Sequence, residues 1–498
     1  MKVVIPDVNL SLASPEIGLV ILICAVIIAD MFVSRENKAG LGVLSLIGVL
    51  VLAAVSLSQW NEGVRTTFSG FYVADNFSVF VKVSLFIATA LSILLSLQYV
   101  KVERINNGEF YALMLFSLFG MIVLASANDL IMIFLGIETM SLSIYVLVGF
   151  IRHDPLSREA ALKYFLMGAF ASGLLLYGMA LVYGLTGTTA LSGIAQAFAG
   201  GRADPSNPAM IFAIILLVAG FGFKLALAPF HMWLPDAYTG APTSITAFMS
   251  VAVKLATFAA LMRLLFVAFG AMAPKWNILL WLLAAFTMTW GNVAAIAQTS
   301  LKRMLAYSSI AHAGYVLMGL VAAMGVEGGK VVFSALGISA VLFYMFVYVF
   351  TSLGAFGMLI LLCREDWRGD NIEDWRGIAH SHPWAAFAFL IFLLSLAGIP
   401  PTAGFVGKLY LFAAAVDNSY YYLAVIGVLT SAISIYYYGR IIMVMFMEVR
   451  EEAQPAVFFS NAPSLFIALL VLTLATLLLG LFPGTFLAAA RGSVSGII

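Results

Sequence analysis

The sequence predicts an all-α polytopic membrane protein of about 14 transmembrane helices, arranged as two inverted five-helix repeats with broken seventh and twelfth helices. Three observations predict this class. Residues AVILMFWYC make up 63% of the 498 positions and charged residues only 10%, where soluble domains carry about 25%. Apolar runs long enough to cross a bilayer as helices recur along the chain. A short motif recurs five runs apart, and prolines interrupt two runs.

The apolar runs define the elements in order. In lipid, only helices and closed barrels satisfy every backbone group, and these runs are too long and too continuously apolar for barrel strands. Because the connections are mostly short, we expect one membrane domain and no sizeable soluble domain. The expected spans are residues 16–33, 40–59, 76–99, 109–126, 128–151, 159–184, 209–238, 242–270, 276–297, 301–324, 330–362, 384–417, 420–447 and 462–482.

The lysines and arginines of the connecting loops predict the orientation. Twelve fall on one side of the membrane and six on the other, and the richer side is expected in the cytoplasm. With an even number of spans, both termini then face outward. The cytoplasmic set is Arg35, Lys38, Lys101, Arg104, Arg152, Arg158, Lys302, Arg303, Arg364, Arg368, Arg376 and Arg450. The opposite set is Lys2, Arg65, Arg202, Lys275, Lys330 and Arg491.

Several function classes are disfavoured by the composition. A net charge of +1 argues against a nucleic-acid partner. Cys24 and Cys363 lie far apart and form no metal or disulfide pattern. His380 and His382 lie close together, but two ligands alone make a poor metal site. The chain has no dinucleotide-binding, phosphate-binding or haem signature, so we expect it to bind no metal or cofactor.

A repeat relates two parts of the chain. The segment Tyr145–Gly149 (YVLVG) recurs as Tyr315–Gly319 (YVLMG), at an offset of 170. The copies lie in the fifth and tenth spans, and an odd offset in spans means that the two units cross the membrane in opposite directions. Inverted-repeat transporters have this arrangement, and their sites lie near the membrane midplane beside discontinuous helices.

Two prolines or proline pairs mark the expected discontinuities. Pro229 and Pro235 interrupt the seventh span, and the run Gly398–Gly404 interrupts the twelfth. Proline removes a hydrogen-bond donor and clashes with the preceding turn. Such a break is tolerated at membrane depth only where it is buried in protein or lines a wet cavity. We therefore expect non-helical backbone within Leu225–Pro235 and within Ala397–Gly404, buried in both cases.

Some basic residues within the spans have an ordinary explanation. Lys82, Arg263 and Arg440 lie nearer the expected span ends, so we expect their charged groups to reach back to the membrane surface. Lys163 is intermediate, one turn inside the sixth span. Glu138 lies in the middle of the fifth span, and we expect it to pair with Lys163 on the next helix.

Three lysines do not fit that explanation. Lys224, Lys254 and Lys408 lie deep in a span or beside a break, where ionisable groups usually mark ion or proton routes. Each charge at the bilayer centre costs roughly 2.5–3.5 kcal/mol on insertion scales. Glu138 supplies only one negative charge against these three lysines and Lys163, so most of the positive charges lack an acidic partner. A lysine can be poised between its charged and neutral forms and so pass a proton on, whereas an arginine holds its proton.

Other polar residues allow two interpretations. His312 lies midway along the tenth span, where it would either extend the proton route or simply bond a backbone carbonyl. Lys302 and Arg303 begin that span, where binding of lipid head groups is at least as good an explanation as a relay. Tyrosines such as Tyr344 and those at 436–438 are more typical of packing or of the membrane interface.

Three longer motifs resemble those of one family. They run from Gly222 to Pro242, from Asn292 to His312 and from Ser395 to Lys408, and they are similar to motifs of the antiporter-like proton-channel subunits of respiratory complex I. The resemblance covers essentially all 498 residues. Within the family, three features resemble the subunit N branch. Lys408 stands where other branches have a glutamate, the chain ends soon after the fourteenth span, and tyrosines precede Arg440.

The resemblance implies a role for each matched residue. Glu138 and Lys163 would form a coupling ion pair, and Lys224 would be the central protonatable lysine of the first half. Lys254 would be the connecting lysine and His312 a further link toward the second half. Lys408 would be the terminal lysine of that half. The resemblance also implies two inverted repeats at 109–270 and 276–447, after N-terminal helices within 1–108 and before a last helix at 462–482. FMN, iron–sulfur clusters, NADH oxidation and quinone would belong to partner subunits, with subunits M and K as neighbours in the bacterial inner membrane.

Two other functions stay open at this point. A subunit of a multi-protein sodium/proton antiporter would have the same fold. A polytopic enzyme acting on lipid-linked substrates would want acidic residues in sizeable polar loops, which this chain lacks.

Overall fold

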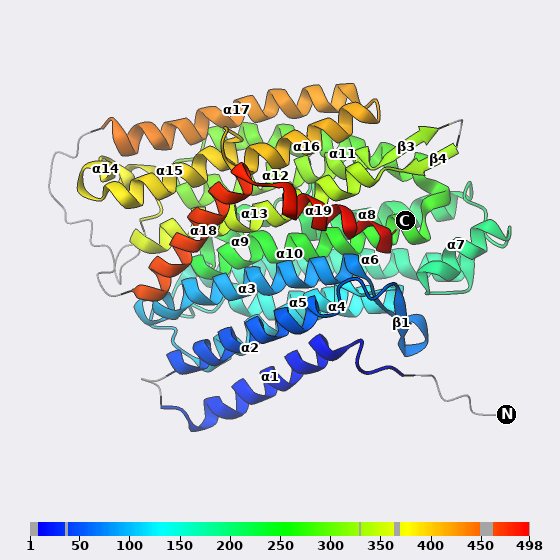
Figure 1. The fold of residues 1–498 in the computed structure, drawn as a ribbon, viewed down its shortest axis with the longest axis horizontal. Coiled ribbons are helices and arrows are strands. Elements are labelled where there is room, and N and C mark those ends of the chain that lie inside the picture. Colours follow the sequence, from blue (N-terminus) through cyan, green and yellow to red (C-terminus); the bar gives the residue numbers. More distant parts are fainter. Residues whose placement is uncertain (1–7, 35–37, 328–329, 363–368, 449–461, 498) are drawn as a thin grey trace.

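The computed structural model describes residues 8–34, 38–327, 330–362, 369–448 and 462–497, and it shows helices lying side by side along the long axis of the molecule (Figure 1). Thirteen helices of these described residues are long and apolar enough to cross a membrane. They are α1 (Ser14–Phe32), α2 (Ala39–Leu57), α3 (Asn76–Val102), α4 (Gly108–Ala125), α5 (Leu130–Val148), α6 (Pro155–Thr186), α8 (Pro208–Leu225), α10 (Thr243–Arg263), α11 (Ala273–Ile296), α12 (Leu301–Ala322), α13 (Ala335–Leu362), α17 (Tyr421–Phe446) and α18 (Pro463–Leu481).

The twelfth expected span is made of two short helices, α15 (Pro383–Ala397) and α16 (Ala403–Asp417). The seventh expected span likewise divides into α8 and the short helix α9 (Leu234–Gly240). Every expected span therefore contains helix, and both predicted breaks are confirmed. The predicted start of the eleventh span was wrong, because residues 330–333 form a strand and α13 begins only at Ala335.

The two breaks begin with the same backbone turn. After α8, Ala226 adopts a left-handed conformation (φ 55°), and the Leu227 N–H donates to the Gly222 carbonyl at 2.8 Å. After α15, Gly398 is left-handed (φ 83°), and the Ile399 N–H donates to the Leu394 carbonyl at 2.9 Å. This helix-ending turn satisfies carbonyls that would otherwise lack a donor. A cis peptide bond follows in each, before Pro229 and before Pro401.

The breaks differ in burial. Residues 226–228 of the first break are buried, with only Pro229 and Met232 exposed, but Pro400 and Pro401 of the second lie on the surface of the chain. The expectation that both breaks are buried was therefore wrong for Pro400 and Pro401 and, in the first break, for Pro229 and Met232. A proline has no N–H to leave unsatisfied, and the residues that follow, from Thr402 to Gly404, are buried again.

The helices at the centre of the bundle are α10, α12 and α13. Nearly every side chain of these three helices is buried, whereas only about a third are buried in the most apolar stretches of α1, α2, α6, α17 and α18. In a bilayer the outer helices would meet lipid or partner chains, so the centre is the part of this chain best shielded from both.

Short elements cover the ends of the bundle. Strands β1 (Arg65–Thr67) and β2 (Tyr72–Ala74) pair antiparallel with Arg65 opposite Ala74, and β3 (Met324–Glu327) and β4 (Lys330–Phe333) pair with Gly325 opposite Val332. Both hairpins and α7 (Leu191–Ala199) lie at one end, and α14 (Ile378–Ser381) lies at the other (Figure 1). The remaining short helix, α19 (Gly484–Gly492), follows α18.

The orientation itself stays a prediction, since the structure contains no membrane. The described chain begins near the hairpin end of the bundle, and its last residues lie toward the same end (Figure 1), as an even number of spans requires. Five of the basic residues used for the orientation lie outside the described residues: Lys2, Arg35, Arg364, Arg368 and Arg450.

A candidate chain of buried ionisable residues

Lys224 occupies the last turn of α8 and is buried. Its ammonium donates to Ser141 Oγ at 2.7 Å and to Tyr145 Oη at 3.0 Å, and it lies 5.4 Å from the centre of the Tyr145 ring. Ser141 and Tyr145 are one turn apart on α5, so they present one face to the lysine. The last turn of a helix also favours a positive charge, because the helix dipole is negative there.

Glu138 lies on the same helix as Ser141 and Tyr145. It lies three residues before Ser141, hence on the same side of the helix, and it is half-buried. Ser172 Oγ on α6 donates to it at 2.5 Å. Because Ser141 binds the Lys224 ammonium, the Glu138 carboxylate lies on the face of α5 that carries this charge. Glu138 therefore belongs to the surroundings of Lys224.

The expected pair of Glu138 with Lys163 is not formed in this structure. Lys163 is half-exposed and pairs with Glu159 Oε1 at 2.6 Å and with Asp236 Oδ2 at 3.2 Å. Glu138 lies level with Ser172, which follows Lys163 by nine residues on α6, or about 13 Å along a helix axis. A lysine side chain does not span that distance, so the two charges are held in separate places.

Lys254 and His312 lie on α10 and α12, at the centre of the bundle. Lys254 is buried on α10, and its ammonium donates to the backbone carbonyl and to the hydroxyl of Ser309 on α12. His312 follows three residues later on α12, is buried, and lies under the electrostatic influence of both Lys254 and Lys408. Lys254 binds Ser309, three residues before His312 on α12, and Lys408 lies over the ring of Tyr315, three residues after it, so His312 lies between the two lysines along this helix.

The contacts of His312 exclude the interpretation as a histidine that only bonds a backbone carbonyl. Its Nδ1 contacts Tyr344 Oη, and its Nε2 lies 3.3 Å from Tyr438 Oη. Tyr438 in turn contacts Ser308 Oγ. Both ring nitrogens therefore face hydroxyls, which can donate and accept a proton in a hydrogen bond.

Lys408 lies on α16, after the second break, and is buried. Its ammonium donates to the carbonyls of Leu396 and Ala397 at 2.9 and 3.0 Å and to Ser431 Oγ at 3.0 Å. It lies 5.0 Å from the centre of the Tyr315 ring. The two carbonyls belong to the last turn of α15, so this ammonium also lies at the negative end of a half-helix.

Tyr315, beside the second lysine, belongs to a hydrogen-bond network with another buried tyrosine, and little in the sequence predicted that network. Tyr437 Oη donates to Asn292 Oδ1 at 3.0 Å, Asn292 Nδ2 donates to Tyr315 Oη at 3.1 Å, and Tyr315 Oη donates to Thr430 Oγ1 at 3.3 Å. Only Tyr436 of the tyrosine run is exposed, as expected of an interface aromatic. The repeat of Tyr145 as Tyr315 was the one signal that pointed to these hydroxyls.

Two basic residues expected to reach the membrane surface are instead buried in ion pairs. Lys82 pairs with Glu16 Oε1 at 2.7 Å, and Arg263 donates to the Asp75 carboxylate through Nη1 and Nη2, at 2.8 and 3.0 Å. The expectation was wrong for both because a buried carboxylate from another part of the chain lies within reach. Arg440 is half-buried, and its expected position at the membrane surface stays a prediction.

The cations at the start of α12 differ from each other. Lys302 is buried and donates to the Ala241 carbonyl at 2.7 Å. The interpretation that this lysine binds lipid head groups is therefore wrong. Arg303 is half-exposed and pairs with Asp236 Oδ1 at 2.8 Å. His231 in the first break is buried with its ring 5.9 Å from that of Trp290, and its Nδ1 has no hydrogen-bond partner in the described chain.

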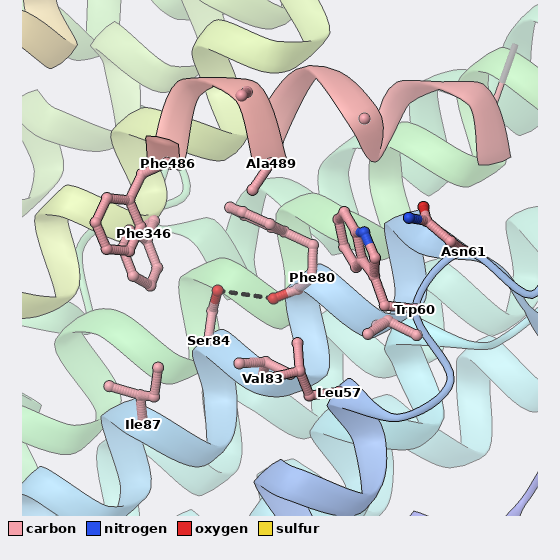
Figure 2. Close-up of a pocket in the computed structure, with 13 residues that line it drawn as sticks. Leu57, Trp60, Asn61, Phe80, Val83, Ser84, Ile87, Phe346, Phe486 and Ala489 are labelled. Atoms are coloured by element: carbon pink, nitrogen blue, oxygen red, sulfur yellow. Dashed lines mark hydrogen bonds between the residues drawn. The ribbon is translucent and has the colours of Figure 1, made fainter. Parts of the chain in front are cut away.

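A large cavity lies away from these charges. It measures about 570 Å³ and is lined by α2, α3, α13 and α19 and by residues just after α2. Figure 2 shows Phe346 and Phe486 together at one side of it and Trp60 with Asn61 at the other. No titratable side chain is among the residues that line it, so it takes no part in the chain of ionisable groups.

Comparison with known proteins agrees with this geometry. The family model described as "NADH:quinone oxidoreductase/Mrp antiporter, TM" matches residues 127–434. NADH-quinone oxidoreductase subunit N of Trichlorobacter lovleyi is 45% identical over 98% of this chain and 97% of its own length. The subunit N of Nitrosomonas europaea is 41% identical over 97% of both chains.

Solved structures extend the comparison to the fold. A chain of respiratory complex I from Thermus thermophilus, solved with bound aureothin, superposes with a TM-score of 0.80 at 34% identity, covering 96% of this chain and 100% of that chain. A chain of the Mrp complex from Dietzia sp. shares only the fold, with a TM-score of 0.78 at 21% identity and 98% of each chain covered. The chain belongs to the family of NADH:quinone oxidoreductase and Mrp antiporter membrane subunits, and within that family to the subunit N group.

Proposed function

We propose that this chain is a proton-translocating membrane subunit of NADH-quinone oxidoreductase. The observation that carries the proposal is the succession of buried ionisable residues Lys224, Lys254, His312 and Lys408, which crosses the centre of the bundle from one broken helix to the other. The chain is part of that enzyme but performs no electron transfer itself. FMN, the iron–sulfur clusters and quinone belong to partner subunits in this proposal.

The proposal includes two half-units, residues 109–270 and 276–447, with N-terminal helices within 1–108 and a last helix at 462–482. The matching turns at the two breaks support this division. So do the matching positions of Lys224 over the ring of Tyr145 and of Lys408 over the ring of Tyr315, because the two tyrosines are copies in the sequence repeat.

Each lysine is suited to hold a proton for a limited time. The ammonium groups of Lys224, Lys254 and Lys408 are bound by neutral hydroxyls and carbonyls. Burial with neutral partners disfavours the charged form, while the hydrogen bonds retain it. A proton can therefore be taken up and released, with serine, tyrosine and histidine side chains between the lysines. Glu138 acts on the first lysine, and we assign Lys163 to a separate cluster described below.

We further propose that the subunit lies in the bacterial inner membrane with both termini on the periplasmic side, and that subunits M and K are its neighbours. The sodium/proton antiporter alternative has weaker support, because the Mrp chain resembles this one in fold alone. No observation favours an enzyme acting on lipid-linked substrates.

The test replaces Lys224 in the assembled enzyme. Lys224→Arg retains the charge but holds its proton too tightly to release it, and Lys224→Ala removes both. We expect NADH-driven proton uptake into inverted vesicles to fall to background for both variants, at normal levels of assembled complex. Full uptake by Lys224→Arg would make Lys224 a fixed charge and would overturn the proton-holding role.

A further inference from the structure

One charged cluster is not used by the proposed route. The carboxylate of Asp236, on α9, is shared by two cations from different helices: its Oδ2 lies 3.2 Å from Lys163 Nζ on α6, and its Oδ1 lies 2.8 Å from Arg303 Nη1 on α12. In the proposed division, α6 and α9 belong to the first half-unit and α12 to the second. Asp236 therefore links the half-units at this end of the bundle.

A second contact between α9 and α12 lies close by. Lys302, the residue before Arg303, donates to the carbonyl of Ala241, the residue that caps the C-terminal end of α9, at 2.7 Å. Neighbouring residues of α12 thus bind both Asp236 near the beginning of α9 and Ala241 at its end. Because α9 is short and is joined to α8 by a non-helical segment, these contacts help to fix its position, together with the buried side chains of Leu234 and Tyr238.

The same short helix reaches the backbone beside Lys224. Trp233, which precedes α9, donates through Nε1 to the carbonyl of Phe223 at 2.9 Å. Its ring stacks on Tyr164 with centres 4.2 Å apart and planes at 6°. Phe223 directly precedes Lys224, and Tyr164 directly follows Lys163. The cluster around Asp236 is therefore connected to the backbone beside Lys224 by one hydrogen bond and one pair of stacked rings.

The link from Asp236 to α6 has a competitor. Glu159, one turn before Lys163 on the same helix, approaches the Lys163 ammonium to 2.6 Å. The side chains of Glu159, Lys163 and Asp236 are 59%, 46% and 34% exposed, and exposed ion pairs each contribute little. Lys163 thus keeps a carboxylate partner when either one is removed, whereas Asp236 is the carboxylate that pairs with Arg303.

We propose that Asp236 is a positioning residue for proton transfer. By binding Lys163 and Arg303 together it sets where α9 lies between the half-units, and through Trp233 it sets the backbone beside Lys224. The proposal rests on the function proposed above, in which Lys224 holds the transferred proton. Nothing in that function requires Asp236 to touch the proton.

The experiment compares Asp236→Asn with Glu159→Gln in the assembled enzyme. Both variants take one carboxylate from Lys163 with little change in size, but only the first removes the charge shared with Arg303. Two quantities are measured: the rate of NADH-driven proton uptake per assembled complex, and the amide hydrogen exchange of a peptide covering residues 226–240. Local exchange reports how firmly that segment is held.

We expect Asp236→Asn to lower uptake several-fold and to speed exchange in that peptide, Glu159→Gln to change neither, and Asp236→Glu to restore both. Lower uptake with unchanged exchange would overturn the proposal, because Asp236 would then act by another route. Faster exchange with normal uptake, or no change in either, would overturn it as well. If Asp236→Asn does not assemble, Arg303→Gln breaks the same contact from α12 and is judged by the same two results.

The proposed function fails independently of this test. Full uptake by Lys224→Arg would remove Lys224 as the proton holder, yet it would leave the exchange comparison between Asp236→Asn and Glu159→Gln unaffected. Failure of the positioning role and failure of the function are therefore distinguishable.

Discussion

The two lysines beside the breaks enter their sites from opposite directions. Lys224 precedes its break, in the last turn of α8, whereas Lys408 follows its break, on α16. Their ammonium groups nevertheless reach equivalent places. Lys408 extends back to the carbonyls of Leu396 and Ala397, at the end of the half-helix that precedes the second break. Both half-units therefore place a positive charge at the C-terminus of a half-helix. They differ in which side of the break carries the lysine that supplies the charge.

The surroundings of the two charges differ more than their positions. Each ammonium lies over a tyrosine of the sequence repeat, but the repeat replaces Ser141 by Ala311 and Glu138 by Ser308. The first lysine therefore has a hydroxyl partner and an acid on the helix beside it. The second is held by two carbonyls and Ser431. We infer that the charge of the first site responds to a neighbouring acid, and that the second depends on neutral dipoles, those of two carbonyls and one hydroxyl.

Replacement of the second lysine is expected to have the largest effect. Lys408→Arg puts a larger cation that does not release its proton against two carbonyls that favour a positive charge. We expect proton uptake into inverted vesicles to fall to background, with the complex still assembled. Arg440→Lys, a change of another cation on the adjacent α17, serves as the control and should leave uptake normal. Full uptake by Lys408→Arg would show that the second site holds a fixed charge.

Removal of the acid at the first site should have a smaller effect. Glu138→Gln retains an oxygen that can accept from Ser172 but removes the negative charge on the face of α5 that binds Lys224. We expect uptake to fall several-fold without reaching background, because Ser141 and Tyr145 still hold the ammonium. The measurement is NADH-driven uptake normalised to assembled complex. Unaltered uptake would reduce Glu138 to a structural residue and would remove the difference drawn between the two sites.

Local signals in the sequence were enough to predict the fold. Hydropathy marks each span because a bilayer imposes a length on every helix, and Pro229 or Pro401 acts on the backbone next to it. Both features depend on neighbouring residues only. The fourteen spans and the two breaks could therefore be predicted from residues read in order, although the hairpin of β3 and β4 was included in a span.

Partners of charged groups could not be predicted in the same way. Whether Lys163 meets Glu138 or Asp236 depends on how far along their axes the helices are placed, and one residue corresponds to about 1.5 Å. The pairing of Arg263 with Asp75 depends on two segments that are 188 positions apart in sequence. Mid-span position alone was a good guide to burial for Lys224, Lys254 and Lys408, but it carried no information on what each one contacts.

The hydroxyl of the repeated tyrosine offers a finer comparison. Tyr145 Oη accepts from Lys224 at 3.0 Å, whereas Tyr315 Oη contacts Asn292 and Thr430 and not Lys408. We expect Tyr145→Phe to lower uptake more than Tyr315→Phe, since the ring remains under the ammonium in both variants and only the first loses a hydrogen bond to the lysine. Equal losses would mean that both hydroxyls take part in the route in the same way.

The smallest difference is expected between two serines, Ser141 and Ser431. Each accepts one hydrogen bond from a buried ammonium, and a hydrogen bond to a charged group contributes about 1.5–3 kcal/mol. Ser141→Ala leaves the ammonium of Lys224 with one oxygen partner among the hydrogen bonds described, whereas Ser431→Ala leaves that of Lys408 with two carbonyls. Lost donors and acceptors cost most where no other partner compensates. We therefore expect a moderate loss of uptake for Ser141→Ala and a slight one for Ser431→Ala, both measured at the same level of assembled complex. A greater loss for Ser431→Ala would contradict the view that backbone carbonyls hold the second charge, and it would make the serine hydroxyl the partner that matters in both half-units.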